Sequence, residues 1–238
     1  MGKFKVMYIP ENRSGTSPFI DFHTHSQWNG SEAIEVVSLH IGRDRPCTFY
    51  TLGFHPWWTE ELLNREQINT LQQKYVQDPF CLGIGECGLD KLKGIDLERQ
   101  EEIFIQQIMV ANLLGAPVIV HCVRAYDRVI RLKKSLAMTP WVIHGFVRNK
   151  VLAKQLLDAD ILMSLAPSSI MANSFEETLK YIPLNSLFLE TDSDFRHNIM
   201  ERYEIMATIR KIEIHHLKEQ IFINFKIFFS EKWKYQTG

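Results

Sequence analysis

The sequence has few of the features that mark disulfide-rich, secreted or membrane-spanning proteins. Only 4 of its 238 residues are cysteines, Cys47, Cys81, Cys87 and Cys122, and none forms a Cys-x-x-Cys pair with another. No window approaches the roughly 18 consecutive apolar residues that suggest a transmembrane helix. Residues 1–10 are too polar for the apolar core of a secretory signal. We therefore expect buried thiols in a reducing compartment, with the cytoplasm as the location and no membrane partner.

The sequence also lacks an excess of charge of either sign. It holds 27 basic and 28 acidic side chains, for a net charge of −1. This balance excludes a uniformly basic surface for nucleic acid but allows a local basic patch. The hydrophobic share of 45% and the charged share of 23% are those of an ordinary globular protein. With no internal repeat or linker visible, we expect residues 1–238 to form one domain.

Eight short apolar runs alternate with helical patterns along the chain. Most of these runs are continuous, which is typical of strands covered on both faces in a parallel sheet. We expect strands at 19–22, 35–40, 48–54, 81–86, 117–121, 141–144, 161–165 and 187–190.

Apolar residues at helical spacing predict helices between several of these strands. The longest pattern begins after a candidate N-cap at Asp96 and stops at Gly115. Shorter apolar stripes within 68–75 and 129–136 predict two more helices. A Ser-x-x-Glu capping box predicts another over 175–181.

The alternation of strands and helices predicts an α/β fold. Eight strands at this chain length favour a (β/α)8 TIM-type barrel, although a doubly wound open sheet would give the same alternation. The first third of the chain is short of residues for crossovers, since only eight separate His25 from Ile34 and a bare turn occupies 42–46. We therefore expect the first two crossover helices to be shortened or missing.

Polar side chains of metal-ligand type follow the apolar runs where the predicted strands end. The segments are IDFHTH at 20–25, GFHP at 53–56, GIGECGLD at 83–90, VIVHC at 118–122, VIHGF at 142–146 and FLETD at 188–192. In a parallel barrel the carboxyl ends of the strands converge on one mouth, where the active sites of such barrels lie. His23 and His25 are two residues apart on an extended segment, so both rings point the same way.

As a set, these residues predict a metal site. A single histidine at a strand end is usually structural, as we expect for His40. Six ionisable groups together are different, because burying them without a counter-charge would be very costly. The candidate ligands are four imidazoles and two carboxylates: His23, His25, Glu86, His121, His144 and Asp192. Such a set suits Zn²⁺, Mn²⁺ or a similar cation, and a pair of ions about 3.5–4 Å apart is the standard device for phosphoester hydrolysis.

In combination, the motifs resemble those of the TatD family of metal-dependent deoxyribonucleases, within the amidohydrolase-like barrels. DFHTH is similar to the family's opening D-x-H-x-H, GFHPWW to its G-x-H-P, and IGECGLD to its I-G-E-I-G-L-D. The motifs VIVHC, VIHGF and LFLETD follow in the family's order. The resemblance covers about 19–229, nearly the whole chain.

The resemblance implies which residues hold the metals, two divalent ions of Zn, Mg or Mn. His23, His25 and Asp192 would bind the first ion. His121 and His144 would bind the second, and the carboxylate at position 86 would bridge the two.

The resemblance also implies the reaction and the substrate contacts. Asp192 and Glu86 would be catalytic, with Asp192 orienting or deprotonating the attacking water. His55, in the G-x-H-P match, would contact the substrate phosphate. The reaction would be hydrolysis of DNA phosphodiester bonds, often from a 3′ end, with single-stranded DNA or DNA ends as the partner.

Several residues near the implied pocket depart from the family pattern. Lys91 stands where an aromatic residue usually follows GLD, Val123 where an arginine is usual, and Asp194 where a proline is common. Arg124 follows Val123 directly and is a candidate phosphate contact, although a surface arginine opening a helix is as good a reading. These changes bear on the substrate and leave the ligand set intact.

The two tryptophans after His55 have two possible roles. Exposed indole rings could stack on unpaired bases, as in proteins that bind single strands. Alternatively, Trp57 and Trp58 could pack a long loop, which we expect for one of the two.

Two other functions stay open at this point. A hydrolase of small phosphate esters or cyclic amides would use the same metals. The near-zero net charge mildly favours it, because long nucleic acids bind more tightly to basic surfaces. A non-catalytic metal-binding protein would keep the ligands without turnover.

Overall fold

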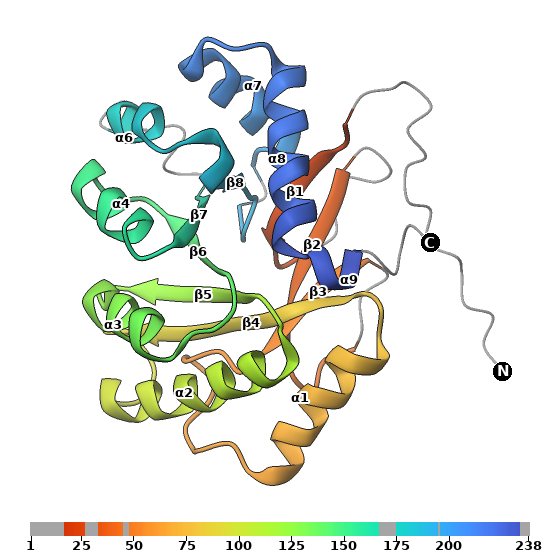
Figure 1. Cartoon of the computed structure of the whole chain (residues 1–238), viewed down its shortest axis with the longest axis vertical. Helices are drawn as coiled ribbons and strands as arrows, with labels where there is room; N and C mark the ends of the chain where they lie inside the picture. The colour runs from red at the N-terminus through yellow and green to blue at the C-terminus, as the bar shows by residue number, and fades with distance from the viewer. Residues whose placement is uncertain (1–16, 27–32, 45–47, 167–174, 195, 234–238) are drawn as a thin grey trace, which may run out of the picture.

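Eight parallel strands form one sheet in the order in which they occur along the chain (Figure 1). The structure, a computed structural model, describes residues 17–26, 33–44, 48–166, 175–194 and 196–233. The strands are β1 Phe19–Thr24, β2 Ala33–His40, β3 Phe49–Gly53, β4 Cys81–Asp90, β5 Val118–Val123, β6 Trp141–Phe146, β7 Ile161–Leu165 and β8 Leu187–Leu189. Each pairs in parallel with the next, and all eight predicted strands are confirmed.

The two ends of the sheet meet at its carboxyl rim. An isolated parallel bridge joins Thr24 to Asp192. The backbone N–H of His25 donates to the Asp192 carbonyl at 3.1 Å, and the Asp192 N–H donates to the His23 carbonyl at 2.9 Å. The sheet is therefore a nearly closed barrel rather than a doubly wound open sheet, and the closing bonds come from the backbone of candidate ligands.

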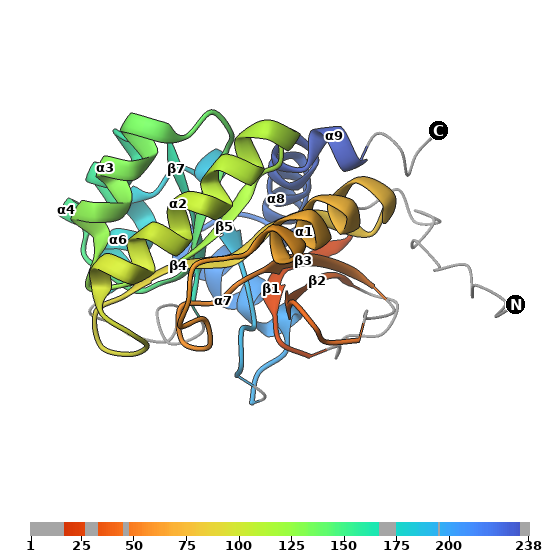
Figure 2. The same cartoon turned by 90° about the horizontal axis from the view of Figure 1, so that it is seen from below.

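Helices pack on the outside of the barrel (Figures 1 and 2). They are α1 Arg65–Gln77, α2 Leu97–Leu114, α3 Tyr126–Leu136, α4 Lys150–Leu157, α6 Glu176–Tyr181, α7 Ile199–Arg210, α8 Ile214–Phe228 and α9 Ser230–Trp233, with a 3₁₀ turn, η2, at Leu184–Ser186. In the described residues between β1 and β2, and between β2 and β3, the chain forms no helix. The described part of these connections agrees with the expected shortage of residues for crossover helices.

The local signals in the sequence account for the helix ends. The Asp96 side chain caps α2 by accepting the Arg99 N–H at 2.9 Å, and Gly115 ends it in the left-handed conformation at φ 65°. Left-handed backbone is cheap for glycine because it has no Cβ. The helix predicted at 175–181 is confirmed as α6, whereas Ser174 of its predicted capping box lies outside the described residues.

The helices after β8 brace the first strand, which carries two of the candidate ligands. Phe22 of β1 stacks on Phe188 of β8 with ring centroids 4.0 Å apart, and Phe229 packs 5.6 Å from Phe22. The Tyr203 hydroxyl of α7 accepts the Ile20 N–H at 3.1 Å and lies 3.2 Å from the Ile20 carbonyl. These contacts hold β1 against the elements that follow β8.

The cysteines behave as the composition predicts. Cys81, Cys87 and Cys122 are free and buried, and burial raises the pKa of the Cys81 and Cys122 thiols to about 12. Cys47 lies outside the described residues. Within the described part of the chain, no helix has the length and apolar character needed to cross a bilayer.

Candidate metal centre

The buried carboxylate of Glu86, on β4, lies at the centre of the strand-end cluster. Three imidazole nitrogens surround its Oε1 atom. His55 Nε2 lies 2.9 Å away, His121 Nδ1 2.7 Å and His144 Nε2 2.7 Å. These rings come from three different strand ends, so one carboxylate oxygen gathers residues that are far apart in the sequence.

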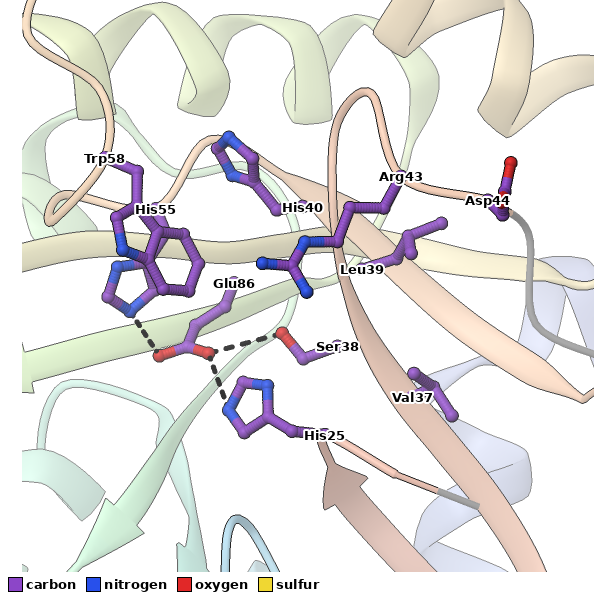
Figure 3. A pocket seen from close by; sticks show the side chains of 10 residues that line it. All are labelled: His25, Val37, Ser38, Leu39, His40, Arg43, Asp44, His55, Trp58 and Glu86. Atoms are coloured by element: carbon purple, nitrogen blue, oxygen red, sulfur yellow. Dashed lines mark hydrogen bonds and ion pairs between the residues drawn. The ribbon is translucent and has the colours of Figure 1, made fainter.

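The second oxygen of Glu86 faces the first two strands. His23 Nε2 lies 3.3 Å and His25 Nε2 3.7 Å from Oε2. The Ser38 hydroxyl of β2 donates to the same oxygen at 3.2 Å (Figure 3). His25 Nε2 also lies 3.3 Å from Oδ1 of Asp192, so the closing end of the barrel joins the cluster.

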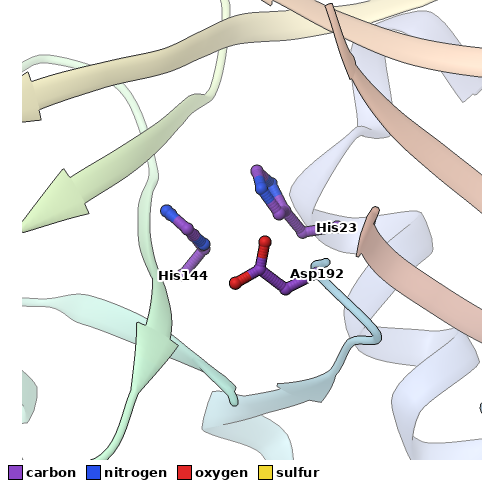
Figure 4. Close-up of side chains that lie close together, drawn as sticks. All are labelled: His23, His144 and Asp192. Atoms are coloured by element: carbon purple, nitrogen blue, oxygen red, sulfur yellow. The ribbon is translucent and has the colours of Figure 1, made fainter. Parts of the chain in front are cut away.

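The structure brings all six predicted ligands together. Their ligand atoms fall into groups in which every atom lies within 4.8 Å of the others: His23, His144 and Asp192; His23, His25 and Glu86; and His55, Glu86 and His121. Figure 4 shows the His23 and His144 rings and the Asp192 carboxylate turned toward a common space. His144 therefore lies near residues expected around the first ion as well as near His121, expected at the second.

The positions of the ring nitrogens fit a metal. His121 Nε2 lies 3.1 Å from Oδ2 of Asp90, and a hydrogen bond between them requires the proton on Nε2. The other ring nitrogen, Nδ1, faces Glu86. His121 Nδ1 and His144 Nε2 lie only 3.3 Å apart, and the buried His23 Nε2 lies 3.3 Å from Glu86 Oε2. Lone pairs that converge on carboxylate oxygens repel one another unless a cation or a proton lies between them.

The pKa shifts within the cluster also indicate that its carboxylates require a positive charge nearby. Burial alone would raise the pKa of Glu86, but His144, His121 and His23 outweigh it and hold that pKa well below its usual value. Burial opposes the charged form of His144, yet Glu86 and Glu190 raise its pKa well above the usual value. Without metal, a proton on an imidazole supplies the positive charge that the carboxylate requires.

Asp192 lies at the open side of the cluster, with about a third of its side chain exposed (32%). Burial disfavours its charged form, but the hydrogen bond from His25 and the charges of His144 and His23 lower its pKa. The carboxylate is therefore ionised at neutral pH and can reach both the cluster and solvent.

Two further carboxylates contact the histidine rings of the cluster. From the sequence, Asp90 could form an ion pair or face the substrate, and Glu190 has no assigned role. Asp90, the last residue of β4, binds His121 as described and accepts the Trp57 indole N–H at 2.6 Å. Although burial acts against ionisation, these bonds and a backbone one lower the pKa of Asp90 to about 2. Glu190 Oε1 accepts the Gly145 N–H at 2.7 Å and lies 3.6 Å from His144 Nδ1. Both residues stand within the motifs GLD and LETD, which was the available signal.

Close packing of β4 against β5 requires glycine at one position. Gly88 has φ +144°, and a Cβ there would overlap the carbonyl oxygen of His121. A larger residue would thus move the strand that carries a ligand.

The two predicted substrate contacts have different environments. His55 belongs to the cluster, while Arg124 is exposed beyond β5 at φ 55° and makes no ion pair with any described residue. Asp194 is directed away from the centre: it accepts from Arg196 Nε at 2.9 Å and pairs with Arg202 Nη2 at 3.4 Å. Lys91 is exposed.

A pocket of about 310 Å³ opens beside Glu86 on the side of β2 and β3 (Figure 3). His25 and His55 form the boundary that it shares with the cluster. His40, Arg43 and Trp58 form much of the rest.

Comparison with known proteins identifies several relatives. A family model described as TatD related DNase matches residues 29–230. The match includes the ligand positions on β4, β5 and β6 and the one after β8, and it begins after the His23–His25 pair. An uncharacterized metal-dependent hydrolase of Buchnera aphidicola, BU355, is 28% identical over 203 residues, which cover 76% of this chain and 77% of that protein.

A second curated relative is the 3'-5' ssDNA/RNA exonuclease TatD of Erwinia billingiae, 29% identical over 178 residues; the match covers 70% of this chain and 65% of that protein. Among solved structures, YJJV, a TatD homolog from Escherichia coli K12, superposes with a TM-score of 0.73 at 21% identity, covering 89% of this chain and 98% of its own. A TatD family hydrolase from Entamoeba histolytica gives a TM-score of 0.70 at 16% identity, covering 89% and 97%. These two structures share the barrel fold with this chain.

Proposed function

This chain belongs to the TatD-related DNase family, and from that membership we propose that its strand-end cluster holds two divalent metal ions and hydrolyses phosphodiester bonds of DNA. One observation carries the proposal. Both oxygens of the buried Glu86 carboxylate face imidazole nitrogens, three around Oε1 and two near Oε2. A carboxylate surrounded in this way is suited to bridge two cations.

The proposed ligand sets follow from which atoms each ring can offer. His23, His25 and Asp192 would hold one ion on the Oε2 side of Glu86. His121 would hold the other through Nδ1, because Asp90 occupies its Nε2–H. His144 would join it through Nε2, and Glu86 would contact both ions.

His55 is better suited to donate a hydrogen bond than to bind a metal. The backbone N–H of Trp57 donates to His55 Nδ1 at 3.1 Å, so a neutral ring carries its proton on Nε2, the atom that faces Glu86. Burial lowers the pKa of His55 and keeps the ring neutral at pH 7. The Nε2–H can donate to a phosphate oxygen placed at the cluster, which supports the role in substrate binding.

The chain's own residues would divide the remaining work. When bound, the metals would acidify a water and stabilise charge on the phosphate oxygens. Asp192, ionised and partly exposed, would orient the attacking water and accept its proton. Asp90 and Glu190 would keep the rings of His121 and His144 in the tautomers that ligation requires.

The substrate proposal draws on the relatives as well as the site. Proteins named 3'-5' ssDNA/RNA exonuclease TatD are similar to this chain over 70% of its length or less. We take single-stranded DNA, attacked at its end, as the substrate. The native metal is Zn²⁺, Mn²⁺ or Mg²⁺.

A direct assay tests this proposal. Purified protein is stripped with EDTA, reloaded with Zn²⁺, Mn²⁺ or Mg²⁺, and given a labelled single-stranded oligonucleotide. We expect metal-dependent release of nucleotides, and a loss of at least about 10³-fold in Glu86→Gln because the bridging charge is removed. Glu60→Gln, which removes an exposed carboxylate, is the matched control and keeps full activity.

A second candidate, hydrolysis of small phosphate esters, is favoured by the net charge of −1 and shares the same metal site. Turnover of a small ester without release from the oligonucleotide would reject the nuclease proposal in favour of this one. Bound metal without turnover of any ester would reject both and leave a metal-binding protein.

A further inference from the structure

The two adjacent tryptophans after β3 have separate environments. Trp57 is committed to the cluster's support: its indole N–H binds Asp90 at 2.6 Å, and the Lys93 ammonium lies 3.9 Å from its ring centroid. Trp58 instead lines the pocket beside Glu86 and keeps 52% of its surface exposed. The Trp58 ring has His55 beside it, with centroids 4.7 Å apart, but an aromatic side chain that is half exposed beside a candidate catalytic centre is suited to contact a ligand.

The other notable side chain of this pocket is Arg43, from the short turn after β2. Its guanidinium lies 6.0 Å from the Trp58 ring centroid. Figure 3 shows it turned toward Trp58 and Glu86, while Asp44 points away. Among the described residues, no carboxylate lies within ion-pair distance of Arg43, although Glu86 and Asp44 both line the same pocket.

Arg43 gives the pocket a permanent positive charge. Burial, together with the charges of His55 and Arg43, lowers the pKa of His40, so the His40 ring is neutral at pH 7. Its Nδ1 is shielded from solvent and has no hydrogen-bond partner in the described residues. The pocket thus offers a permanent cation, a partly exposed indole ring and a polar atom without a partner among the described residues, beside the carboxylate at the centre of the cluster.

We propose that this pocket is a nucleotide subsite: Arg43 binds the phosphate next to the scissile one, and Trp58 stacks on the attached base. The inference rests on the proposed phosphodiesterase function. The guanidinium fork matches phosphate oxygens, and an indole face accepts any base. The volume of about 310 Å³ is at the lower end for ligand pockets, about 300–1,000 Å³, which suits one nucleotide and not a longer strand.

The short connection after β2 and the segment after β3 place the two side chains beside the cluster. The connection from β2 to β3 is short, so Arg43 comes three residues after the strand end at His40. Trp58 comes from the segment after β3 and packs against His40 and His55, with ring centroids 5.3 and 4.7 Å apart. Both side chains therefore sit at the rim beside the cluster without belonging to it.

The experiment compares two substrates in the full-length protein. One is a single-stranded oligonucleotide, and the other is methyl p-nitrophenyl phosphate, a diester too small to fill the pocket. We expect Arg43→Ala and Trp58→Ala each to lower kcat/KM on the oligonucleotide by about tenfold, the order for losing one phosphate contact or one base stack. Turnover of the small diester stays at the wild-type rate. Trp58→Phe recovers most of the loss, since it keeps an aromatic face.

Arg99→Ala is the control, because Arg99 is an exposed arginine on α2 and its loss changes the net charge equally. Wild-type rates on the oligonucleotide in both pocket variants would overturn the subsite. Equal losses on both substrates would also overturn it, because they would place the two residues in support of the cluster.

A binding measurement separates this inference from the proposed function. A labelled trinucleotide with phosphorothioate linkages is titrated in Ca²⁺ buffer and followed by fluorescence anisotropy. Weaker binding to Arg43→Ala and Trp58→Ala than to wild type supports the subsite, whether or not the two substrates are turned over. A lack of turnover of both substrates would reject the phosphodiesterase proposal instead. Unchanged binding in an active enzyme rejects the subsite alone.

Discussion

The barrel has two arcs that contribute similar side chains but are built differently. In the lean arc, β1–β3, the described connections between strands contain no helix, whereas every strand of the helix-covered arc, β4–β8, is followed by one. Nevertheless His23 and His25 from one arc and His121 and His144 from the other all lie within 3.7 Å of the Glu86 carboxylate. Crossover helices are therefore not what places the ligands.

The lean arc takes its support from the other. On α2, Gln107 is buried and its side-chain amide makes two hydrogen bonds with the backbone of Phe54, at 2.8 and 3.0 Å. Gln106 does the same with Leu63. These bonds hold the segment that carries His55 and both tryptophans. Together with Tyr203 of α7, which contacts β1, they support this arc through elements that are distant in sequence.

The largest effect is expected where the arcs join, at Asp192. Asp192→Asn keeps the backbone bonds that close the barrel but removes the proposed base. We expect kcat to fall by about 10²–10⁴-fold, the range for a positioned general base, with an unchanged circular dichroism spectrum. Asp158→Asn, an exposed carboxylate after α4, is the control. Near-normal turnover in Asp192→Asn would remove this residue from the chemistry.

A smaller effect is expected from Asp90, which orients His121 in the helix-covered arc. Asp90→Asn should weaken metal binding by about 10–100-fold, as for other partners behind metal-binding histidines. Competition with a chelating dye measures this affinity. Asp96→Asn is a matched control because asparagine also caps a helix. An unchanged affinity would mean that the His121 ring needs no partner to face the metal.

Gln107→Ala tests whether hydrogen bonds from α2 stabilise the lean arc. The substitution leaves the buried Phe54 N–H and carbonyl without partners, so we expect a loss of about 1–3 kcal/mol in the free energy of unfolding. Urea titration measures it, and Gln73→Ala on the exposed face of α1 should have no effect. If both variants unfold at the wild-type midpoint, the arc is held by other contacts.

The smallest effect is expected at Tyr203, where one hydroxyl serves β1. Tyr203→Phe keeps the ring packing against Phe19, whose centroid is 5.1 Å away, and removes the hydrogen bonds to Ile20. We expect a loss of about 1 kcal/mol in the free energy of unfolding. A midpoint in urea equal to that of wild type would show that β1 does not depend on this bond.

The sequence alone predicts the strands, and the gathering of the candidate ligands at one end of the barrel, because both depend on local pattern. Continuous apolar runs mark buried parallel strands, and a histidine or acid at the end of such a run must face the barrel mouth. The expectation of one domain stays a prediction, as do the ligand roles.

What the sequence could not predict depends on contacts between distant residues. The split between Trp57 and Trp58 follows from Asp90, 33 residues after Trp57, and from a pocket formed across β1–β4. The role of Gln107 depends on Phe54, 53 residues earlier. Arg43 lies in a turn with no motif, so only its position beside Trp58 draws attention to it.

Anomalous scattering from crystals loaded with Zn²⁺ or Mn²⁺ is the most direct test. Two peaks on either side of the Glu86 carboxylate, one beside His23, His25 and Asp192 and the other beside His121 and His144, are the predicted result. A single ion held by one arc only, or ions bound away from Glu86, would contradict the account.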